Sequence, residues 1–337
     1  MSRLALLILG CVGLLGTAQA SDAVSLSVKN HVQVGAGSAS LTVSAAETGS
    51  VQVDLKCSGE RFSMRASMAA GTEKTLEFRG LWAGTHPCKG SLQLSAGGGT
   101  AQMPLDFEVT VHEPLAITAP SDTLDLTNRT VSIQSSRPLA SARIEVIGPQ
   151  RAVLAQSEIN VDQSGQYLLG WDPTEGEVLQ IIITGTDTHG LRGERVLSPW
   201  SYAIPHEDVV FASGSHDVVA AEVPKLEAAW TELQAVRAKY GDVVQMKLFV
   251  AGYTDTMGDN VANLALSERR AKSIAAWFKS RGFTGEVLFQ GFGEDVLAVE
   301  TYDDVDEPAN RRAAYIVAAD TPIKSEQLPH DHWQRLP

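Results

Sequence analysis

The chain is poor in cysteine and in aromatic residues, and after its first twenty residues it has no long apolar run. Phe, Tyr and Trp make up 6% of the 337 residues, and eight of them lie between residues 21 and 205. A transmembrane β-barrel carries aromatic girdles at both membrane interfaces, so this scarcity argues against a barrel. No later segment reaches the roughly 18 continuous apolar residues of a spanning helix, which argues against a transmembrane helix after residue 20.

Basic residues are scarce relative to acidic ones. The sequence holds 27 Lys and Arg against 40 Asp and Glu, which gives a formal net charge of −13. Nucleic acid and anionic lipid are both bound through clusters of basic side chains. The composition therefore argues against nucleic acid and acidic membrane surfaces as general partners.

The first twenty residues have the pattern of a secretory signal. Arg3 precedes the apolar run 4–16, and the small residues Ala18 and Ala20 frame a cleavage site. We predict a signal peptide over residues 1–20 and a mature chain of about 317 residues, long enough for two or three domains. An alternative is a lipoprotein signal that ends at Cys11, although the seven apolar residues before this cysteine make a short membrane-engaging segment.

Cys57 and Cys88 are the cysteines that remain after removal of the signal peptide. Disulfides persist in exported proteins, so we predict that the two residues pair and close a loop of about thirty residues. On the chain-entropy model such a loop stabilises its domain by roughly 3 to 4 kcal/mol. Two buried free thiols are the alternative. A zinc site is not expected, because no histidine pair lies at the right spacing.

Residues 21–204 alternate apolar and polar side chains in short runs separated by turn formers. Runs such as VSLSVKN, VQVDLKC and SLQLSA lie before residue 113, and RTVSIQSS, SARIEVIG and EVLQIIITGTD lie after it. Period-two alternation broken by turns at this spacing is typical of all-β sandwiches. We predict two immunoglobulin-like or fibronectin-like sandwiches, over residues 21–113 and 114–204, with a hairpin turn at residues 187–190.

Nothing in these β regions indicates catalysis. No nucleophile, base and orienting group fall at a catalytic spacing, and no polar cluster containing histidine is evident there. The acidic run 303–307 is expected to be a solvated loop rather than a metal site. The sequence therefore predicts a protein that is not an enzyme and that has no cofactor and no metal site.

From residue 205 the pattern changes to alternating strands and helices. A linker over residues 198–205 precedes an expected strand at 208–212, a helix from Val223 to Tyr240, a strand ending in LFVAG, a helix over about 261–281, and strands EVLFQGFG and AAYIVAA. Pro224 suits a first helical turn. These elements predict an α+β domain of βαβαβ type over residues 205–320, with helices covering a sheet. A flexible tail is expected over 321–337, including His330 and His332.

Two charges in this domain are placed to bind a ligand. Asp255 follows a strand where the chain turns into a helix, a position at which α/β sheets leave a ligand crevice. Asn263 and Arg270 are seven residues apart, so they lie one above the other on that helix, whereas Arg269 points elsewhere. A carboxylate and a guanidinium facing one another complement a zwitterionic amino acid. A surface ion pair explains the spacing equally well.

Several motifs here resemble the OmpA-like C-terminal domain, which is shared with peptidoglycan-associated lipoproteins and flagellar stator proteins. They are GYTDTMG, Asn263, LSERRA at 266–271, GFGE at 291–294 and NRRA at 310–313. The resemblance covers residues 206–318, about a third of the chain. It implies non-covalent binding of the peptidoglycan stem peptide through its diaminopimelate residue, which ends in a free amino acid.

The resemblance also assigns ligand residues. It places the ligand aspartate on Asp255 and the ligand arginine on Arg270. Supporting contacts fall on Met257, Asn263, Arg311 and the backbone of Ser213 and Gly214. Arg311 rather than Arg312 is predicted to reach the site. The chain departs from the family pattern at Tyr253, where the family has histidine, and at Ala212, where it has an acid, and it ends in NRRAAY. The change at Ala212 puts contacts of the first loop in doubt.

The sequence as a whole predicts a periplasmic protein of a Gram-negative bacterium, associated with the outer membrane. Its C-terminal domain would hold the cell wall, and its β-sandwiches would bind another envelope protein. The alternative is an outer-membrane β-barrel or porin tethered to the wall by the same C-terminal domain.

Overall fold

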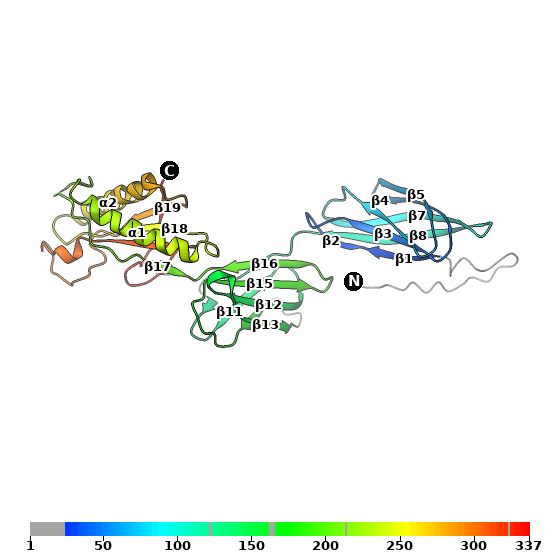
Figure 1. Ribbon diagram of the computed structural model, residues 1–337, viewed down its shortest axis with the longest axis horizontal. Helices are drawn as coiled ribbons and strands as arrows, with labels where there is room; N and C mark the ends of the chain where they lie inside the picture. Colours follow the sequence, from blue (N-terminus) through cyan, green and yellow to red (C-terminus); the bar gives the residue numbers. More distant parts are fainter. Residues whose placement is uncertain (1–23, 121–122, 162–165, 213, 323) are drawn as a thin grey trace. The chain divides into compact units, whose positions relative to one another are not determined.

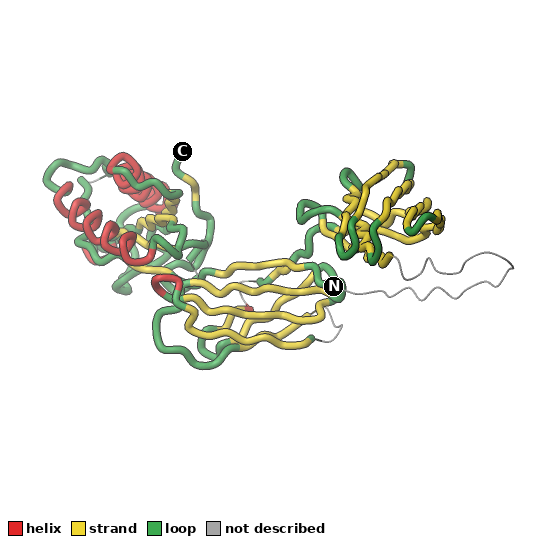
Figure 2. Tube along the Cα trace, turned by 45° about the vertical axis from the view of Figure 1, so that its right-hand side comes forward, coloured by secondary structure: helices red, strands yellow, loops and turns green. Residues whose placement is uncertain are grey.

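A computed structural model describes residues 24–120, 123–161, 166–212, 214–322 and 324–337 (Figure 1). The predicted signal peptide and Cys11 lie outside the described residues. The long helices belong to the C-terminal part of the chain, and strands dominate the rest (Figure 2). Among the described residues, no helix is both long and apolar enough to cross a membrane.

The chain divides into two compact units. The first comprises Met1–Arg143, Glu158–Leu169 and Thr184–Arg195, and the second comprises Ile144–Ser157, Gly170–Ile183 and Val196–Pro337. The division therefore runs through the second predicted β domain. The three domain ranges expected from the sequence stay a prediction.

Residues 24–112 form two sheets around one apolar core. One sheet has the order β1 (Val24–Lys29), β3 (Ala39–Ala45), β6 (Glu73–Phe78). The other has the order β2 (His31–Gln33), β8 (Gly99–His112), β7 (Gly84–Ala96), β4 (Gly49–Cys57), β5 (Glu60–Met68). Alternate residues of each strand face the core, as Leu41 and Val43 of β3 and Val51 and Val53 of β4 do. The predicted alternation is thus confirmed for this region.

The predicted disulfide between Cys57 and Cys88 is present. The two cysteines are direct cross-strand neighbours on β4 and β7, with Cα atoms 4.1 Å apart. Both are fully buried in the core between the two sheets. The bond therefore links two central strands rather than two loops.

The second β region has two four-stranded sheets. One joins β10 (Leu124–Asp125), β11 (Thr130–Ser135) and β14 (Gln166–Gly170), with β9 (Ile117–Thr118) also paired to β11. The other has the order β13 (Val153–Asn160), β12 (Leu139–Ile147), β15 (Gln180–Asp187), β16 (Arg192–Leu197). A 3-10 turn, η2 (Pro149–Arg151), follows β12. The tight turn predicted at residues 187–190 joins β15 to β16.

The C-terminal domain is a five-stranded sheet with two helices. The strand order is β17 (Ser201–Ala203), β20 (Ala313–Ala318), β18 (Lys247–Gly252), β19 (Val287–Gly291), β21 (Gln334–Arg335). Strands β18 and β19 run parallel, and the other pairs are antiparallel. The helices are α1 (Val223–Tyr240) and α2 (Asn260–Arg281), with a short 3-10 turn, η3 (Pro308–Asn310), before β20.

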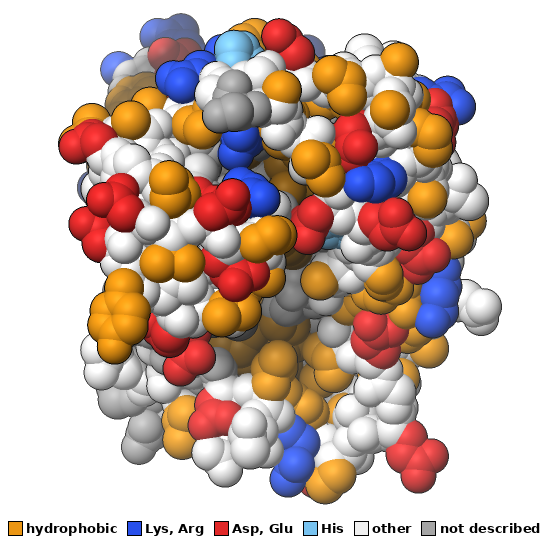
Figure 3. Space-filling view, turned by 90° about the vertical axis from the view of Figure 1, so that its left-hand side faces the viewer, with side chains coloured by type: hydrophobic (Ala, Val, Ile, Leu, Met, Phe, Trp, Pro, Cys, Tyr) orange, Lys and Arg blue, Asp and Glu red, His pale blue; other side chains and the backbone are white. Residues whose placement is uncertain are grey.

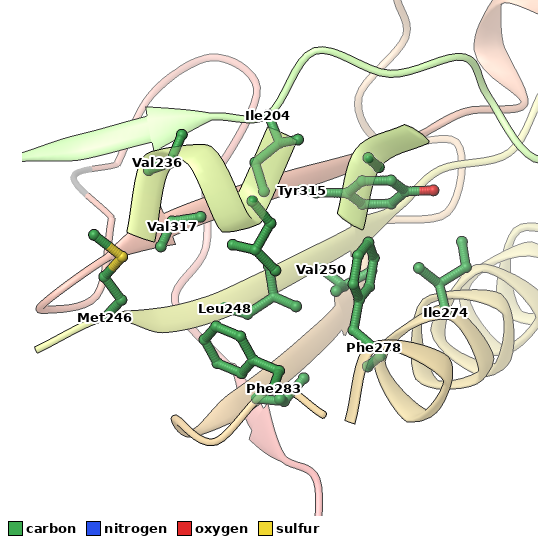
Figure 4. Close-up of a cluster of buried hydrophobic side chains, with 14 of the residues drawn as sticks. Ile204, Val236, Met246, Leu248, Val250, Ile274, Phe278, Phe283, Tyr315 and Val317 are labelled. Atoms are coloured by element: carbon green, nitrogen blue, oxygen red, sulfur yellow. The ribbon is translucent and has the colours of Figure 1, made fainter. Parts of the chain in front are cut away.

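The helices form where the sequence predicts them, because local signals mark their ends. Pro224 lies in the first turn of α1. Asp259 caps α2 by accepting a hydrogen bond from the Ala262 N–H, and Gly282 ends it in the left-handed conformation at φ 115°. The apolar stripes then pack on one face of the sheet (Figure 4). Fully buried Phe278 alone contributes about 1.5–3 kcal/mol.

Two expectations for this domain are wrong. Residues 208–212 form no strand, and the sheet is instead edged by β17, within the predicted linker. Pro205 has no N–H, so it cannot continue the pairing of β17 toward residue 208.

The expected flexible tail packs against the sheet: β21 pairs with β19, and Trp333 contacts Phe249 at a centroid distance of 5.1 Å. Leu328 and Trp333 of the tail pack on the face opposite the helices.

A further correction concerns the β regions, where no polar cluster with histidine was expected. His31, His112 and His189 lie together, with one nitrogen of each ring within 4.8 Å of the others. The sequence hides this cluster because long stretches of chain separate the three residues. Only the pairing of β2 with β8, and the turn before β16, bring them together.

Candidate functional site

The site begins at the turn that leaves β18. The turn backbone is fixed by two hydrogen bonds, from the Tyr253 N–H to the Arg312 carbonyl and from the Thr254 N–H to the Gly293 carbonyl. Asp255 follows directly and is 6% exposed. A carboxylate this buried carries a desolvation cost unless it is paired or hydrogen-bonded. Helix α2 and the loop before β20 supply the side chains that contact this turn.

Helix α2 approaches the strand ends closely because two of them finish in glycine. A Cβ at Gly252 would lie 2.4 Å from the Ser267 carbonyl oxygen, and one at Gly291 would lie 2.4 Å from the Glu268 nitrogen. The buried Ser267 hydroxyl accepts a hydrogen bond from the Gly293 N–H at 2.9 Å. This close approach sets the position of the helix face that carries Asn263 and Arg270.

Asn263 organises the turn around Asp255. Its amide nitrogen donates to the carbonyl oxygens of Met257 at 3.0 Å and Asp255 at 3.4 Å, and to the Glu294 carboxylate at 2.6 Å. Asn263 is 6% exposed. One side chain therefore joins α2, the turn after β18 and the GFGE segment.

Asp255 is paired with an arginine from the loop before β20. The Arg311 guanidinium donates to Asp255 Oδ2 at 2.5 Å and also contacts the Asp306 carboxylate. The pKa of Arg311 is raised by the hydrogen bonds to Asp255 and to Asp306. Among the described residues, no hydrogen bond is made to Asp255 Oδ1. That oxygen can accept a hydrogen bond from a ligand.

Arg270 is a buried cation of a different kind. Its Nε donates to the Ser215 carbonyl at 3.0 Å, and its guanidinium lies over the Phe211 ring, 5.1 Å from the centroid. Among the described residues, no carboxylate oxygen lies within 4.0 Å of its guanidinium nitrogens. Burial lowers the pKa of Arg270, Asp255 raises it, and the cation of Arg311 lowers it further. Arg270 is 9% exposed, and its terminal nitrogens can bind an anion.

The other predicted residues fall around this centre. Met257 is 47% exposed beside the turn, and Gly214 is exposed with φ 67°. Ser213 lies outside the described residues. Arg269 is exposed while Arg270 is buried, as the helical period predicts. The predicted ligand set stays a prediction, although the structure brings Asp255, Asn263, Arg270 and Arg311 to one edge of the sheet.

Sequence reasoning missed three groups at this site. Phe211, the Ser215 carbonyl and Asp306 each contact one of the arginines. All three lie in segments that form neither a helix nor a strand in the structure, so their partners could not be inferred from residue spacing. The acidic run around Asp306 indicated only weakly that a basic side chain would pair with it.

The departure at Tyr253 has a local explanation. The Tyr253 ring is buried, stacks on Phe292, and lies under the Arg312 guanidinium at 4.1 Å. Its hydroxyl donates to the Gln327 carbonyl at 2.8 Å. Burial raises the pKa of Tyr253 to about 12, so the ring is neutral near pH 7. Arg312 is therefore held on Tyr253, away from Asp255.

The arrangement can bind a molecule that carries both charges. Asp255 offers an acceptor for an ammonium group, and Arg270 offers donors for a carboxylate. Figure 3 looks onto the C-terminal domain, where acidic side chains gather with basic ones between them. Such a surface has no broad basic patch on the face shown, so an anion would be bound by individual side chains.

Comparisons with known proteins cover this domain. The chain is 34% identical over 88 residues to outer membrane protein A of Serratia odorifera, covering 26% of this chain and 34% of that protein. It is 29% identical over 109 residues to the peptidoglycan-associated lipoprotein of Haemophilus influenzae, covering 32% of this chain and 67% of that protein. The solved peptidoglycan-associated lipoprotein of Burkholderia pseudomallei aligns at 22% identity, with a TM-score of 0.27, over 33% of this chain and 88% of that one.

The chain thus spans about a third of the length of the Serratia protein that it matches. Residues 210–311 also match the family model of the OmpA family. This range contains the quoted motifs GYTDTMG, LSERRA and GFGE and the residues Asp255, Asn263, Arg270 and Arg311. The resemblance stated from those motifs is therefore confirmed, and residues 210–311 form an OmpA-family domain.

Proposed function

We propose that this protein is a non-catalytic component of the bacterial envelope that binds peptidoglycan through its C-terminal domain. The relatives support this function, since one is an outer membrane protein and another is named for its association with peptidoglycan. The protein works on the periplasmic side, at the outer membrane. The bound group is the diaminopimelate residue of the stem peptide, whose free end carries an ammonium and a carboxylate.

The observation that carries this proposal is the buried guanidinium of Arg270, which has no carboxylate within ion-pair distance among the described residues. A cation held out of water without a counterion costs folding free energy. A carboxylate ligand would supply the missing anion. Asp255, whose Oδ2 is held by Arg311, would take the ammonium group through Oδ1. Asn263 would fix the turn so that the two charges stay apart.

The N-terminal β regions would be immunoglobulin-like or fibronectin-like interaction modules. The first has two sheets enclosing one core, and the second also has two sheets. Such architectures present loops and strand edges to partners. A second envelope protein is the proposed partner, held near the cell wall by the C-terminal domain.

Sedimentation with purified diaminopimelate-containing sacculi tests the site. Asp255→Ala and Arg270→Ala should each weaken binding by about tenfold or more, because each variant leaves one charge of the bound ligand buried without a partner. Arg269→Ala is the matched control: it removes the same charge from the neighbouring, exposed position and should bind as wild type does. Wild-type binding by both site variants would falsify the assignment.

Sacculi that carry lysine in place of diaminopimelate separate the two ligand charges. They keep the ammonium group but lack the distal carboxylate, so Arg270 has no anion to bind. Binding of the wild type should fall to the level of Arg270→Ala. Equal binding to both kinds of sacculi would show that the glycan strands are recognised instead.

A further inference from the structure

Three histidines of the first unit form a compact cluster outside the peptidoglycan site. His31 Nδ1 and His112 Nε2 are 2.9 Å apart, within hydrogen-bonding distance. The His189 ring stacks on His31 at a centroid distance of 3.8 Å, and its centroid is 5.2 Å from that of His112. One nitrogen from each ring lies within 4.8 Å of the other two. Three imidazole nitrogens therefore lie within one small volume.

The fold places each histidine on the outside of its element. Strands β2 and β8 pair in parallel, with His31 opposite Thr110 and Gln33 opposite His112. Val32 and Val111 point into the core, so period-two alternation turns His31 and His112 outward on the same face. His189 lies in the turn between β15 and β16, where Gly190 takes the left-handed conformation at φ 78°.

One arginine holds the chain beside all three histidines. Arg137 Nε donates to Asp187 Oδ2 at 3.0 Å, and its terminal nitrogens donate to the Glu113 carbonyl at 2.7 Å and the Gln33 Oε1 at 3.5 Å. These three partners are two residues before His189, one residue after His112 and two residues after His31. The segments that carry the cluster are thus held together by contacts other than those of the rings.

The turn that carries His189 is fixed as well. Asp187 Oδ1 accepts hydrogen bonds from the backbone N–H groups of His189 and Leu191, both at 2.9 Å. Asp187 is 2% exposed. This network orients the segments without using the imidazole nitrogens. Metal sites in proteins commonly depend on such supporting contacts around the ligands.

The donor set defines the class of ion. Imidazole nitrogen is a borderline ligand that suits Zn²⁺, Cu²⁺ and Ni²⁺, whereas Mg²⁺ and Ca²⁺ prefer oxygen.

We propose that His31, His112 and His189 form a binding site for a divalent transition metal ion of the zinc class. Three protein nitrogens leave at least one coordination position open to water or to a further ligand. The lone pairs of parallel stacked rings do not point at one ion, so ligation requires the exposed His189 ring to turn. Bound metal would join β2, β8 and the turn before β16.

Calorimetric titration of the full mature chain, made without a histidine tag, with Zn²⁺ tests the site. All proteins should carry His330→Ala and His332→Ala, because these two tail rings, 6.0 Å apart, could chelate metal themselves. We expect one zinc per chain, with affinity lowered at least tenfold by His31→Ala, by His112→Ala and by His189→Ala. Mg²⁺ should show no binding at the same concentration. Zn²⁺ should raise the melting temperature of the parent and not of the three variants.

The His189→Ala variant decides the result, since this exposed side chain can be removed with little effect on folding. Circular dichroism of the metal-free proteins checks that the fold is retained. A Co²⁺ absorption spectrum of the parent gives a second readout, because visible d–d bands report nitrogen ligation directly. Zinc affinity unchanged in folded His189→Ala, or no zinc binding by the parent below about 1 mM, a free energy of about −4 kcal/mol, would overturn the proposal.

Discussion

Arg270 and Arg311 are two arginines of one site with opposite expected effects on stability. Arg311 neutralises the buried Asp255 carboxylate, whereas Arg270 has no carboxylate partner within ion-pair distance among the described residues. A charge without a counterion opposes folding, and a charge that neutralises a buried partner supports it. The difference separates a residue that we propose binds ligand from one that also stabilises the fold.

We predict that Arg270→Met leaves the free energy of unfolding unchanged or raises it by up to about 2 kcal/mol, because methionine keeps the packing on Phe211 without the buried charge. Arg311→Met should lower it by about 1–3 kcal/mol, because Asp255 loses its partner. Urea denaturation of both variants measures the difference. A loss of stability in Arg270→Met as large as that in Arg311→Met would contradict this division of roles.

Tyr253 gives the domain an alkaline pH dependence. Its pKa is raised by burial from 10.0 to about 12, despite the opposing effect of Arg312. Between these pH values the unfolded chain releases the phenol proton while the folded chain keeps it, so stability falls as pH rises. Relative to Tyr253→Phe, the wild type should lose on the order of 2–3 kcal/mol by pH 12. If the free energies of unfolding of the two proteins changed in parallel from pH 9 to 12, this result would contradict the raised pKa of Tyr253.

Single residues of the site could be predicted where they lie on a regular element. The helical period separates Arg270 from Arg269 and aligns it with Asn263, and the structure agrees. Residues that act from loops, such as Phe211 and Asp306, could not be predicted, because loops have no period. The three histidines were missed for a related reason: their contacts depend on strand pairing and on tertiary structure.

At the scale of elements, the position of α2 depends on how closely it approaches the strand ends. Gly252 and Gly291 end two parallel strands under the same helix turn, and Ser267 packs between them. A methyl group on either glycine would meet helix backbone, which cannot move without the whole helix. The helix carries Asn263 and Arg270, so a small displacement of α2 moves two residues of the proposed binding site.

Gly291→Ala should lower the free energy of unfolding by about 1–3 kcal/mol, because its Cβ would lie 2.4 Å from the Glu268 nitrogen. Binding to sacculi should weaken as well, since Arg270 moves with α2. Gly99→Ala is the control, because the nearest atom to its added Cβ is the Ala96 carbonyl oxygen at 3.9 Å and the φ of Gly99 is not positive. Equal denaturation midpoints for the two variants would show that α2 tolerates the displacement.

Helices were easier to predict than strands in this domain. Both helices begin and end within one residue of their expected limits, because Pro224, Asp259 and Gly282 act locally. The prediction of a strand at 208–212 was wrong, because a segment can join a sheet only where an edge strand of that sheet is still unpaired. The edge of β20 is already paired with β17, and the Ile204 N–H extends that pairing to Tyr315.

At the scale of the whole molecule, the sequence indicated the composition of the β regions but not their division into compact units. Alternation of apolar residues is a local property, whereas the boundary between units depends on contacts distant in sequence. The packed tail likewise could not be predicted from a local pattern. Its apolar residues are few and widely spaced, yet Leu328 and Trp333 pack on the sheet face that the helices leave open, and Leu336 joins the core under the helices.

The disulfide and the proposed ligand residues belong to different compact units, so their effects should be separable. The double variant Cys57→Ala/Cys88→Ala should lower the free energy of unfolding of the first β region by about 3–4 kcal/mol, because the unfolded chain regains the freedom of a loop with a separation of 31 residues. Retention on sacculi should equal that of the wild type, since Asp255, Arg270 and Arg311 keep their surroundings. Calorimetric unfolding and sedimentation of the same preparation measure both quantities. Reduced retention at a temperature where the C-terminal domain is folded would show that the first unit contributes to wall binding.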